Sequence, residues 1–217
     1  MATTIDLTDQ RALRSVLGRF PSGVCVVTGR DPEGRTVGLA CQSFMGVSLD
    51  PPLVLISVMK TSRTLPHLKD GAGFAVSVLG EGDEAVSTMA GSKAADKFEQ
   101  IELTTTTSGH QVLTGAPAWF ACELEAWVDA GDHVLLIGRV LEAGPADSDR
   151  GPLLFHNGRY ASLGAEPAAG TKEPAAGAAE PASGAAGTAA GAAKPAGAAE
   201  TDDLSGLLAL MGPGTWL

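Results

Sequence analysis

The sequence predicts a mainly β protein, an antiparallel β-barrel with a few peripheral helices packed on its outside. Short runs of β-branched and apolar residues recur along the chain and outnumber the helical patterns. Residues 53–59 form an apolar run in which only Ser57 is polar, which is typical of a strand buried on both faces. Asn157-Gly158, between two further short runs, is the strongest hairpin signal in the chain. Strands joined by turns rather than by helices favour an antiparallel barrel.

A short helix is expected first. Its apolar residues recur at the spacing of one helix face, i, i+3, i+4 and i+7, at Leu13, Val16, Leu17 and Phe20. Thr8 or Asp9 is placed to cap its start, because a side-chain oxygen there accepts hydrogen bonds from unpaired helical N–H groups. Pro21 and Gly23 are expected to end it.

A hairpin and a polar loop follow the helix. Residues 24–28 and 36–43 are β-prone, and the Asp-Pro and Gly residues of 29–35 predict the turn between them. Pro51-Pro52 cannot donate backbone hydrogen bonds, so the pair ends a loop and begins the strand at 53–59. That loop is able to present N–H and hydroxyl groups to a flat, polar-edged ligand, through Gln42, Ser43, Gly46 and Ser48. An ordinary connection between strands is the alternative.

The other elements of the barrel are expected in this order. A helix begins near Ser62 or Thr64, has Pro66 in its first turn and ends near residues 70–71. After it we expect a strand at 74–79, a helix at 83–91, a helical turn at 93–98, an exposed β-prone run at 103–108, and two long strands at 118–130 and 134–143.

The chain divides into three predicted parts. Residues 8–163 are expected to form the barrel domain. Residues 164–201 are nearly all Ala, Gly, Pro and Glu, and bury too little apolar surface to offset the entropy of ordering, so we expect a disordered linker. Residues 202–217 regain a helical apolar spacing, at Leu204, Leu207, Leu208 and Met211. This C-terminal peptide is either a short amphipathic helix that docks on a partner or on the protein itself, or a frayed terminus.

Composition argues against several classes of partner. The 217-residue chain has a net charge of −10, whereas nucleic acids and anionic membranes are bound by basic surfaces. No apolar run approaches the roughly 20 residues of a membrane span, and the first residues lack a signal-peptide pattern, so we expect a cytoplasmic protein. The cysteines have no metal-ligand spacing, no metal site is indicated, and buried free thiols are expected at Cys25, Cys41 and Cys122.

One ordered set of motifs points to a family. It comprises Phe-Pro-Ser-Gly-Val at 20–24, Ser-Phe-x-x-Val-Ser-Leu-Asp-Pro-Pro-Leu-Val-Leu at 43–55, Thr-Ser-Arg-Thr at 61–64, Lys-Phe at 97–98, Gly-Asp-His at 131–133, Pro-Leu at 152–153 and Gly-Arg-Tyr at 158–160. In this order the set resembles the flavin reductase family, the small reductase components of two-component flavin monooxygenases. The resemblance implies a flavin-binding split barrel, bound FMN or FAD, NADH or NADPH as hydride donor, and a homodimer.

The same resemblance implies where the flavin ring lies. Backbone groups along the end of one strand would face the edge of the ring, at Leu39, Ala40, Cys41, Gln42 and Ser43. Aimed N–H donors there would stabilise the negative charge that reduction places on the N1–C2=O end of the ring. Gln42 stands where the family often has a small or hydroxyl-bearing residue, so only its backbone role carries over. Cys41 either lines this site or is simply a buried thiol.

Two segments are implied for the flavin phosphate. The first offers hydroxyls, amides and one guanidinium at a predicted helix start, in Ser57, Val58, Ser62, Arg63 and Thr64. The second follows the next predicted helix, in Ala90, Gly91, Ser92, Lys97 and Phe98. Plain helix capping is the alternative for Ser62 and Thr64, and solvated helix surface is the alternative for Lys97.

His133 is the implied catalytic residue. It would hydrogen-bond the nicotinamide carboxamide or the flavin edge, and its alternative is a structural histidine at the start of a strand. The resemblance further implies a segment that closes over the cofactor, at Gly158, Arg159 and Tyr160, with Arg159 placed to meet a dinucleotide phosphate.

These implications together predict an NAD(P)H:flavin oxidoreductase that supplies reduced flavin to a separate monooxygenase. One alternative is a non-catalytic flavin-binding carrier or partner-binding module. Another is a split-barrel flavoprotein with a different oxidoreductase activity. The sequence does not distinguish FMN from FAD, or NADH from NADPH.

Overall fold

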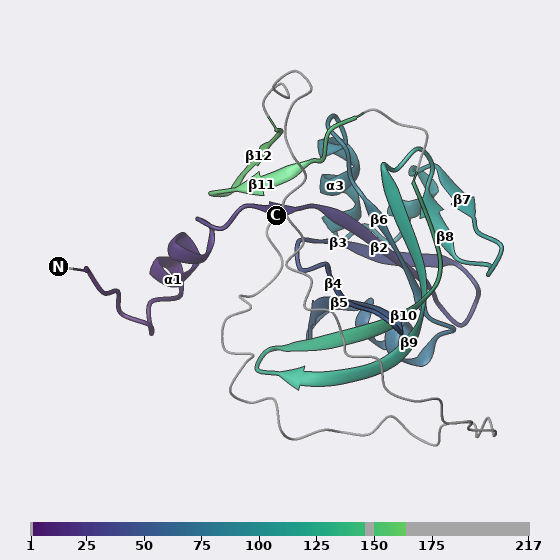
Figure 1. Ribbon diagram of the computed structural model, residues 1–217, viewed down its shortest axis with the longest axis horizontal. Helices are drawn as coiled ribbons and strands as arrows, with labels where there is room; N and C mark the ends of the chain where they lie inside the picture. Colours follow the sequence, from purple (N-terminus) through teal and green to yellow (C-terminus); the bar gives the residue numbers. More distant parts are fainter. Residues whose placement is uncertain (1, 146–149, 164–217) are drawn as a thin grey trace, which may run out of the picture.

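A seven-stranded antiparallel sheet forms the body of the protein, with its strands in the order β3-β2-β6-β9-β10-β5-β4 (Figure 1). The computed structural model describes residues 2–145 and 150–163. The strands of this sheet are β2 (Cys25–Arg30), β3 (Thr36–Cys41), β4 (Met45–Leu49), β5 (Pro52–Met59), β6 (Phe74–Val78), β9 (Ala118–Ala130) and β10 (His133–Pro145).

The barrel closes where the chain after β3 is bonded to β5. Ser43 Oγ accepts a hydrogen bond from the Ser57 N–H at 2.9 Å and donates one to the Ser57 carbonyl at 3.0 Å. β3 and β5 are not neighbours in the sheet order, so their backbones are not paired with each other. The Ser43 side chain therefore links the end of β3 to β5. The predicted antiparallel barrel with outer helices is therefore confirmed.

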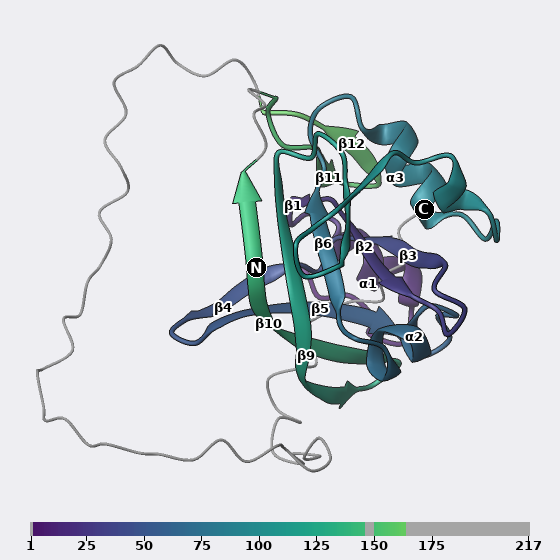
Figure 2. The same cartoon turned by 90° about the vertical axis from the view of Figure 1, so that its right-hand side faces the viewer.

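Helices and two small sheets surround the barrel. They are α1 (Gln10–Leu17), α2 (Leu65–Asp70), α3 (Glu84–Gly91), the 3₁₀ turn η1 (Lys97–Glu99), and strands β1 (Ser22–Gly23), β7 (Leu103–Thr105), β8 (Gln111–Leu113), β11 (Leu154–His156) and β12 (Arg159–Ala161). Figure 2 shows α3 close to β11 and β12 at one end of the barrel and α2 toward the other. Within the part of the chain that the structure describes, no helix has the length and apolar character needed to cross a membrane.

Two apolar clusters fill the protein, and β2 contributes to both because successive side chains of a strand point to opposite faces. Val27 belongs to the cluster inside the barrel, with Ile56, Phe74, Val76 and Leu136. Val26 belongs to a second cluster beneath the outer elements, with Leu79, Ala90, Phe98 and Leu153. The barrel wall at β2 is thus buried on both sides, which fixes α3 and η1 against it.

The first helix differs from its prediction in extent and burial. Asp9 is the cap, and its carboxylate accepts from the N–H groups of Arg11 and Ala12 at 2.9 and 3.2 Å. The helix ends at Leu17, earlier than expected, because the next residues turn back onto its last carbonyls. None of its residues is buried, and α1 stands away from the barrel in Figure 1.

The predicted polar loop is partly a strand. β4 pairs with β5 from Met45 opposite Leu55 to Leu49 opposite Pro52. Its glycine and serine residues hide the β pattern in the sequence, and the double proline marks only the turn that follows. The apolar side chains of β4 are exposed to solvent, with Leu49 at 96%.

The residues that precede α2 and α3 use their side chains outside the helix start. Thr64 precedes α2, yet its hydroxyl donates to the Gly38 carbonyl at 3.1 Å. Asp83 precedes α3, and its carboxylate accepts from the Gly80 N–H at 2.9 Å and from Arg150 at 2.6 Å. The predicted linker at 164–201 and C-terminal peptide at 202–217 lie outside the described residues.

Candidate functional site

The end of β3 is the meeting point of the predicted site segments. Thr64 ties the loop before α2 to the Gly38 carbonyl, and Ser43 ties the residues after β3 to Ser57 on β5. On the other face of β3, Ala40 packs against the cluster that contains Ala90 and Phe98. Segments from four separate parts of the chain therefore converge on one strand.

Two cations approach each other beside this strand. Arg63 Nη2 donates to the Lys93 carbonyl at 2.6 Å. Lys97 Nζ donates to the carbonyls of Ala90 and Ser92 at 2.5 and 3.0 Å. Within residues 2–145 and 150–163, neither Arg63 nor Lys97 forms an ion pair with a carboxylate. Burial, and then the charge of Arg63, lowers the pKa of Lys97. Such a pair is suited to a phosphate, because each cation retains donors for oxygen.

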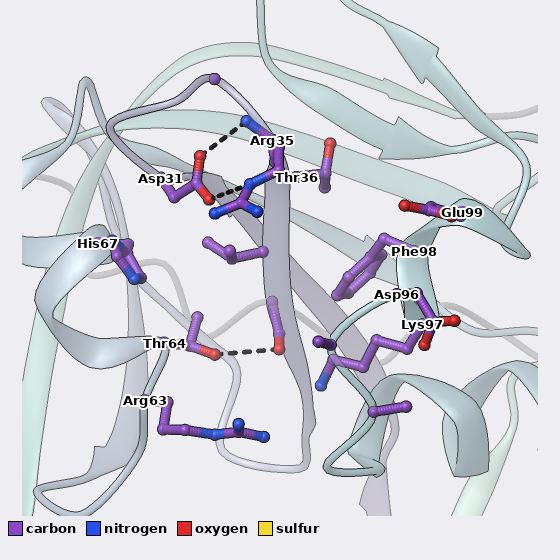
Figure 3. Close-up of a pocket in the computed structure, with 15 residues that line it drawn as sticks. Asp31, Arg35, Thr36, Arg63, Thr64, His67, Asp96, Lys97, Phe98 and Glu99 are labelled. Carbon is purple, nitrogen blue, oxygen red and sulfur yellow. Dashed lines mark hydrogen bonds and ion pairs between the residues drawn. The ribbon is translucent and has the colours of Figure 1, made fainter.

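A cavity of about 690 Å³ opens next to these cations (Figure 3). Its walls are the β2–β3 turn, the outer part of β3, the start of α2 and the segment at 94–99. Arg63, Thr64, Lys97 and Phe98 line it among the predicted site residues. Its volume lies within the range of roughly 300–1,000 Å³ found for small-molecule sites.

The predicted anion site lies at the start of a short helix. α2 has only six residues, and Ser62 Oγ accepts from the Thr64 N–H at 3.3 Å in the turn before it. The Thr64 hydroxyl is already bonded to β3. The side chains of Arg63 and Lys97 add two positive charges at this position.

Most residues predicted to face the ring edge have side chains that pack or hydrogen-bond within the protein. Leu39 and Cys41 pack against the barrel interior, and the Gln42 amide oxygen accepts from Ser22 Oγ at 3.0 Å. β3 is an edge strand of the sheet, so its outer backbone groups remain candidates for the predicted backbone role. Burial raises the pKa of Cys41 to about 11, which favours the inert thiol over a thiolate. Cys25, Cys41 and Cys122 are all free.

His133 begins β10 and is 2% exposed. Its Nδ1 lies 2.7 Å from Asp132 Oδ1, and this hydrogen bond is the main cause of a lowered pKa for Asp132. β10 pairs with β5 so that His133 lies opposite Met59 and Leu135 lies opposite Ser57. His133 thus lies on the same face of the sheet as Ser57, whereas Val58 points to the opposite face. His133 does not line the cavity of Figure 3.

The predicted closing segment is only partly connected to this region. Tyr160 donates from its hydroxyl to Ser87 Oγ on α3 at 3.0 Å and contacts the Phe155 ring edge-on. Gly158 lies in the β11–β12 turn with a φ of 76°, and Arg159 is exposed beside it. Neither Gly158 nor Arg159 lines the cavity.

Sequence reasoning missed one wall of the cavity, the turn that carries Asp31 and Arg35. Their Oδ2 and Nε atoms are 2.8 Å apart, and Asp31 Oδ1 accepts from the Arg35 N–H at 2.8 Å. An acid and an arginine four residues apart across a predicted turn are a weak signal for such a pair. Nothing in the sequence places that turn opposite η1.

Comparison with known proteins identifies the family. Residues 17–164 match the model of the flavin reductase like domain. HsaB from Rhodococcus jostii, the reductase subunit of a flavin-dependent monooxygenase, is 41% identical over 162 residues, which are 75% of this chain and 82% of that protein. The FMN reductase (NADH) SmoA from Agrobacterium fabrum is 38% identical over 152 residues, 70% of this chain and 85% of its own.

Solved structures agree with these relatives. The NADH:FAD oxidoreductase SgcE6 from Streptomyces globisporus, in complex with NAD and FAD fragments, superposes with a TM-score of 0.71 and 33% identity over 76% of this chain and 99% of that one. The family match spans every motif segment that suggested the resemblance, and it contains all the predicted site residues from Leu39 to Tyr160. The predicted resemblance is confirmed: the chain belongs to the flavin reductase family.

Proposed function

We propose that this protein is an NAD(P)H:flavin oxidoreductase that supplies reduced flavin to a separate monooxygenase. The observation that carries the proposal is the pair of cations, Arg63 and Lys97, at the mouth of a cavity beside β3. A flavin nucleotide fits these residues: its phosphate matches the two cations, and the buried Ser57 hydroxyl, which lacks a partner among the described residues, is available near the ring edge.

The proposed role of each residue follows from its position in the structure. A bound flavin supplies the hydride acceptor. Arg63 and Lys97 hold the phosphate, and the backbone amides of residues 39–43 orient the ring and stabilise negative charge on its edge. His133, held by Asp132, would hydrogen-bond the nicotinamide carboxamide and so help to orient the hydride donor.

We infer a homodimer from the exposed apolar residues. β4 is an edge strand of the sheet, and Met45, Val47 and Leu49 are 47%, 48% and 96% exposed. Val16 and Phe20, in and after the detached α1, are 52% and 79% exposed. A second copy that covers both surfaces would remove them from water, as edge strands in soluble proteins require. Light scattering on the purified chain tests this, and a monomer at micromolar concentration would contradict it.

The cytoplasm is the proposed location, because three free thiols within the described residues suit a reducing compartment.

A single assay separates the proposed activity from its alternatives. The full chain is mixed with NADH or NADPH and with FMN or FAD, and loss of the nicotinamide absorbance band is followed. Oxidation that depends on added flavin supports the reductase. Tightly bound flavin without nicotinamide oxidation supports the carrier, and oxidation that needs another acceptor supports a different oxidoreductase.

Arg63→Gln provides the matched perturbation. We expect the flavin concentration for half-maximal rate to rise, with Lys60→Gln as the control. Lys60 is an exposed lysine paired with Asp129 at 3.1 Å, so its loss removes the same charge without touching the cavity. Equal effects of both variants would show that only long-range charge matters.

A further inference from the structure

Two of the three cysteines lie directly opposite each other in the barrel wall. Cys25 is the first residue of β2, Cys41 is the last residue of β3, and the two are paired in the antiparallel register. Residues opposite each other in such a pair point to the same face of the sheet. Cys25 belongs to the cluster inside the barrel and Cys41 packs against it. The proposed flavin chemistry uses neither thiol.

The register places the two side chains within reach of a disulfide. Residues opposite each other in an antiparallel pair have Cα atoms about 4.5 or 5.5 Å apart, and both values lie inside the range of about 4.4–6.8 Å found across disulfides. Their Cβ atoms are about 4.5–5.5 Å apart, against a mean of about 3.8 Å in a disulfide. A bond between Cys25 and Cys41 therefore requires the ends of β2 and β3 to approach by about 1 Å.

Cys122 is too distant to compete for either thiol. Cys25 lies level with Val78 on β6, and Val78 lies level with Ala118 on β9. Cys122 is farther along β9 than Ala118 by about 13 Å, at the rise of a strand. Cα atoms more than about 7 Å apart are not bridged by a disulfide. All three cysteines lie in the described residues, so Cys25 and Cys41 are the pair able to form one.

Cys41 is the thiol that an oxidant reaches first. It is half-buried, whereas Cys25 is 3% exposed. Burial raises the pKa of Cys41 to about 11, and hydrogen bonds from the backbone N–H groups of Ser43 and Phe44 oppose this rise. Burial, and then the charge of Cys41, raises the pKa of Cys25 well above its usual value. The thiolate therefore forms at Cys41, beside a neutral Cys25 thiol that is able to attack an oxidised sulfur.

A disulfide at this position would act on the proposed flavin site. Cys41 lies within residues 39–43, whose backbone is proposed to orient the ring, and Ser43 is bonded to Ser57 on β5. A misplacement of about 1 Å is enough to reduce an enzymatic rate by about a hundredfold. Reduced flavin that no oxygenase consumes reacts with O₂ to give oxidised flavin and hydrogen peroxide, so the proposed activity itself supplies an oxidant.

We propose that hydrogen peroxide joins Cys25 and Cys41 in a reversible disulfide, and that this bond slows flavin reduction. The Cys41 thiolate attacks one peroxide oxygen, the O–O bond breaks, and the departing hydroxide takes up the proton that the thiol lost, which leaves a sulfenic acid and water. The Cys25 thiol then attacks the Cys41 sulfur, the S–O bond breaks, and a second water leaves. Two thiols are oxidised to one disulfide, and one peroxide is reduced to two waters. The effect on flavin reduction, though not the disulfide itself, rests on the proposed function.

Peptide mapping of the full chain tests the bond. The reduced protein is treated with hydrogen peroxide, the remaining thiols are alkylated, and a tryptic digest is analysed by mass spectrometry. Arg30 and Arg35 lie between the two cysteines, so trypsin separates them unless they are joined. We expect a joined pair of peptides that contain Cys25 and Cys41, and an alkylated Cys122. Below the pKa of Cys41, the rate of disulfide formation should rise about tenfold per pH unit, because the thiolate is the attacking species.

Flavin-dependent NADH oxidation measures the consequence. After catalase has removed the peroxide, the rate should be lower by about tenfold or more. Dithiothreitol should restore it, because a bond that displaces the strands is readily reduced. Cys41→Ala should abolish both the joined peptides and the loss of rate, whereas Cys25→Ala should leave sulfenic or sulfinic acid at Cys41. Cys122→Ala, which removes another buried thiol, should respond to peroxide as the wild-type chain does.

Three results would overturn the inference. They are the absence of the joined peptides after peroxide treatment, an unchanged rate in a chain whose Cys25 and Cys41 are fully joined, or an equal loss of rate in Cys41→Ala. Peptide mapping requires neither flavin nor NADH, so it reports on the disulfide whether or not the proposed function holds. A reduced chain that oxidises NADH with neither FMN nor FAD would remove the proposed function instead.

Discussion

Replacing Lys97 with glutamine tests the phosphate site directly. The Lys97 ammonium is half-buried, donates to two carbonyls and faces Arg63 without a paired carboxylate in the described residues. A hydrogen bond to a charged group contributes about 1.5–3 kcal/mol, so Lys97→Gln should weaken FMN binding roughly 10- to 150-fold. Riboflavin has the same ring without the phosphate, and its affinity should change little.

The comparison of FMN with riboflavin is made by fluorescence titration of the full chain. Lys60→Gln, which removes the same charge from an exposed position, should leave both affinities within about twofold. If Lys97→Gln weakens FMN and riboflavin equally, Lys97 acts by holding the loop that contains Ala90 and Ser92, and the phosphate assignment is wrong.

The pH dependence of the same site has a definite sign. The pKa of Lys97 is lowered from 10.5 in the folded protein, chiefly by burial and then by Arg63. FMN affinity should therefore fall as pH rises toward 10.5, because the ammonium is lost earlier than in an exposed lysine. Stability of the flavin-free protein should rise over that window, since the unfolded chain binds more protons there than the folded one. In Lys97→Gln, both slopes should be smaller.

Three further predictions concern other parts of the chain. Gly38→Ala should destabilise the protein by about 1–3 kcal/mol in urea unfolding, because a Cβ there would lie 2.1 Å from the Val27 carbonyl oxygen and 2.7 Å from Phe98; an unchanged midpoint would show that β3 moves freely. His133→Ala should slow NADH oxidation while FMN affinity stays nearly constant, and equal losses of both would indicate a structural histidine. Deleting residues 164–217 should leave flavin reduction unchanged, and a collapse of the rate would contradict the linker prediction.

Sequence patterns predict the elements whose periodicity is uninterrupted. β5 is apolar except for Ser57, and β9 and β10 are long enough for their alternation to be recognised. Asn157 and Gly158 adopt positive φ values of 51° and 76°, as their turn requires. β4 was not predicted, because it is held in place by pairing with β5. Gly46 and Ser48 have little intrinsic preference for strands, so the local sequence gives no β signal.

The site was predicted in part for a related reason. Residues that lie in a recognisable motif, such as Arg63 and Lys97, were found, and the structure brings them to one strand. Asp31 and Arg35 were not, because their place opposite η1 depends on how β2 and β3 pack against segments more than 60 residues away. The burial of His133 could not be predicted either. The sequence shows that Asp132 is adjacent, but it does not show which strands cover the histidine.

The distribution of charge links stability to function. A chain of net charge −10 repels anions at long range, so an anionic ligand must be attracted by a local cluster. Arg63 and Lys97 form such a cluster, and their mutual repulsion destabilises the flavin-free state. Binding of a phosphate removes that repulsion and stabilises the folded chain further by mass action, about 2.7 kcal/mol at a ligand concentration of 100 Kd. On the proposed function, the same two side chains would make the empty protein less stable and would favour phosphorylated flavins over riboflavin.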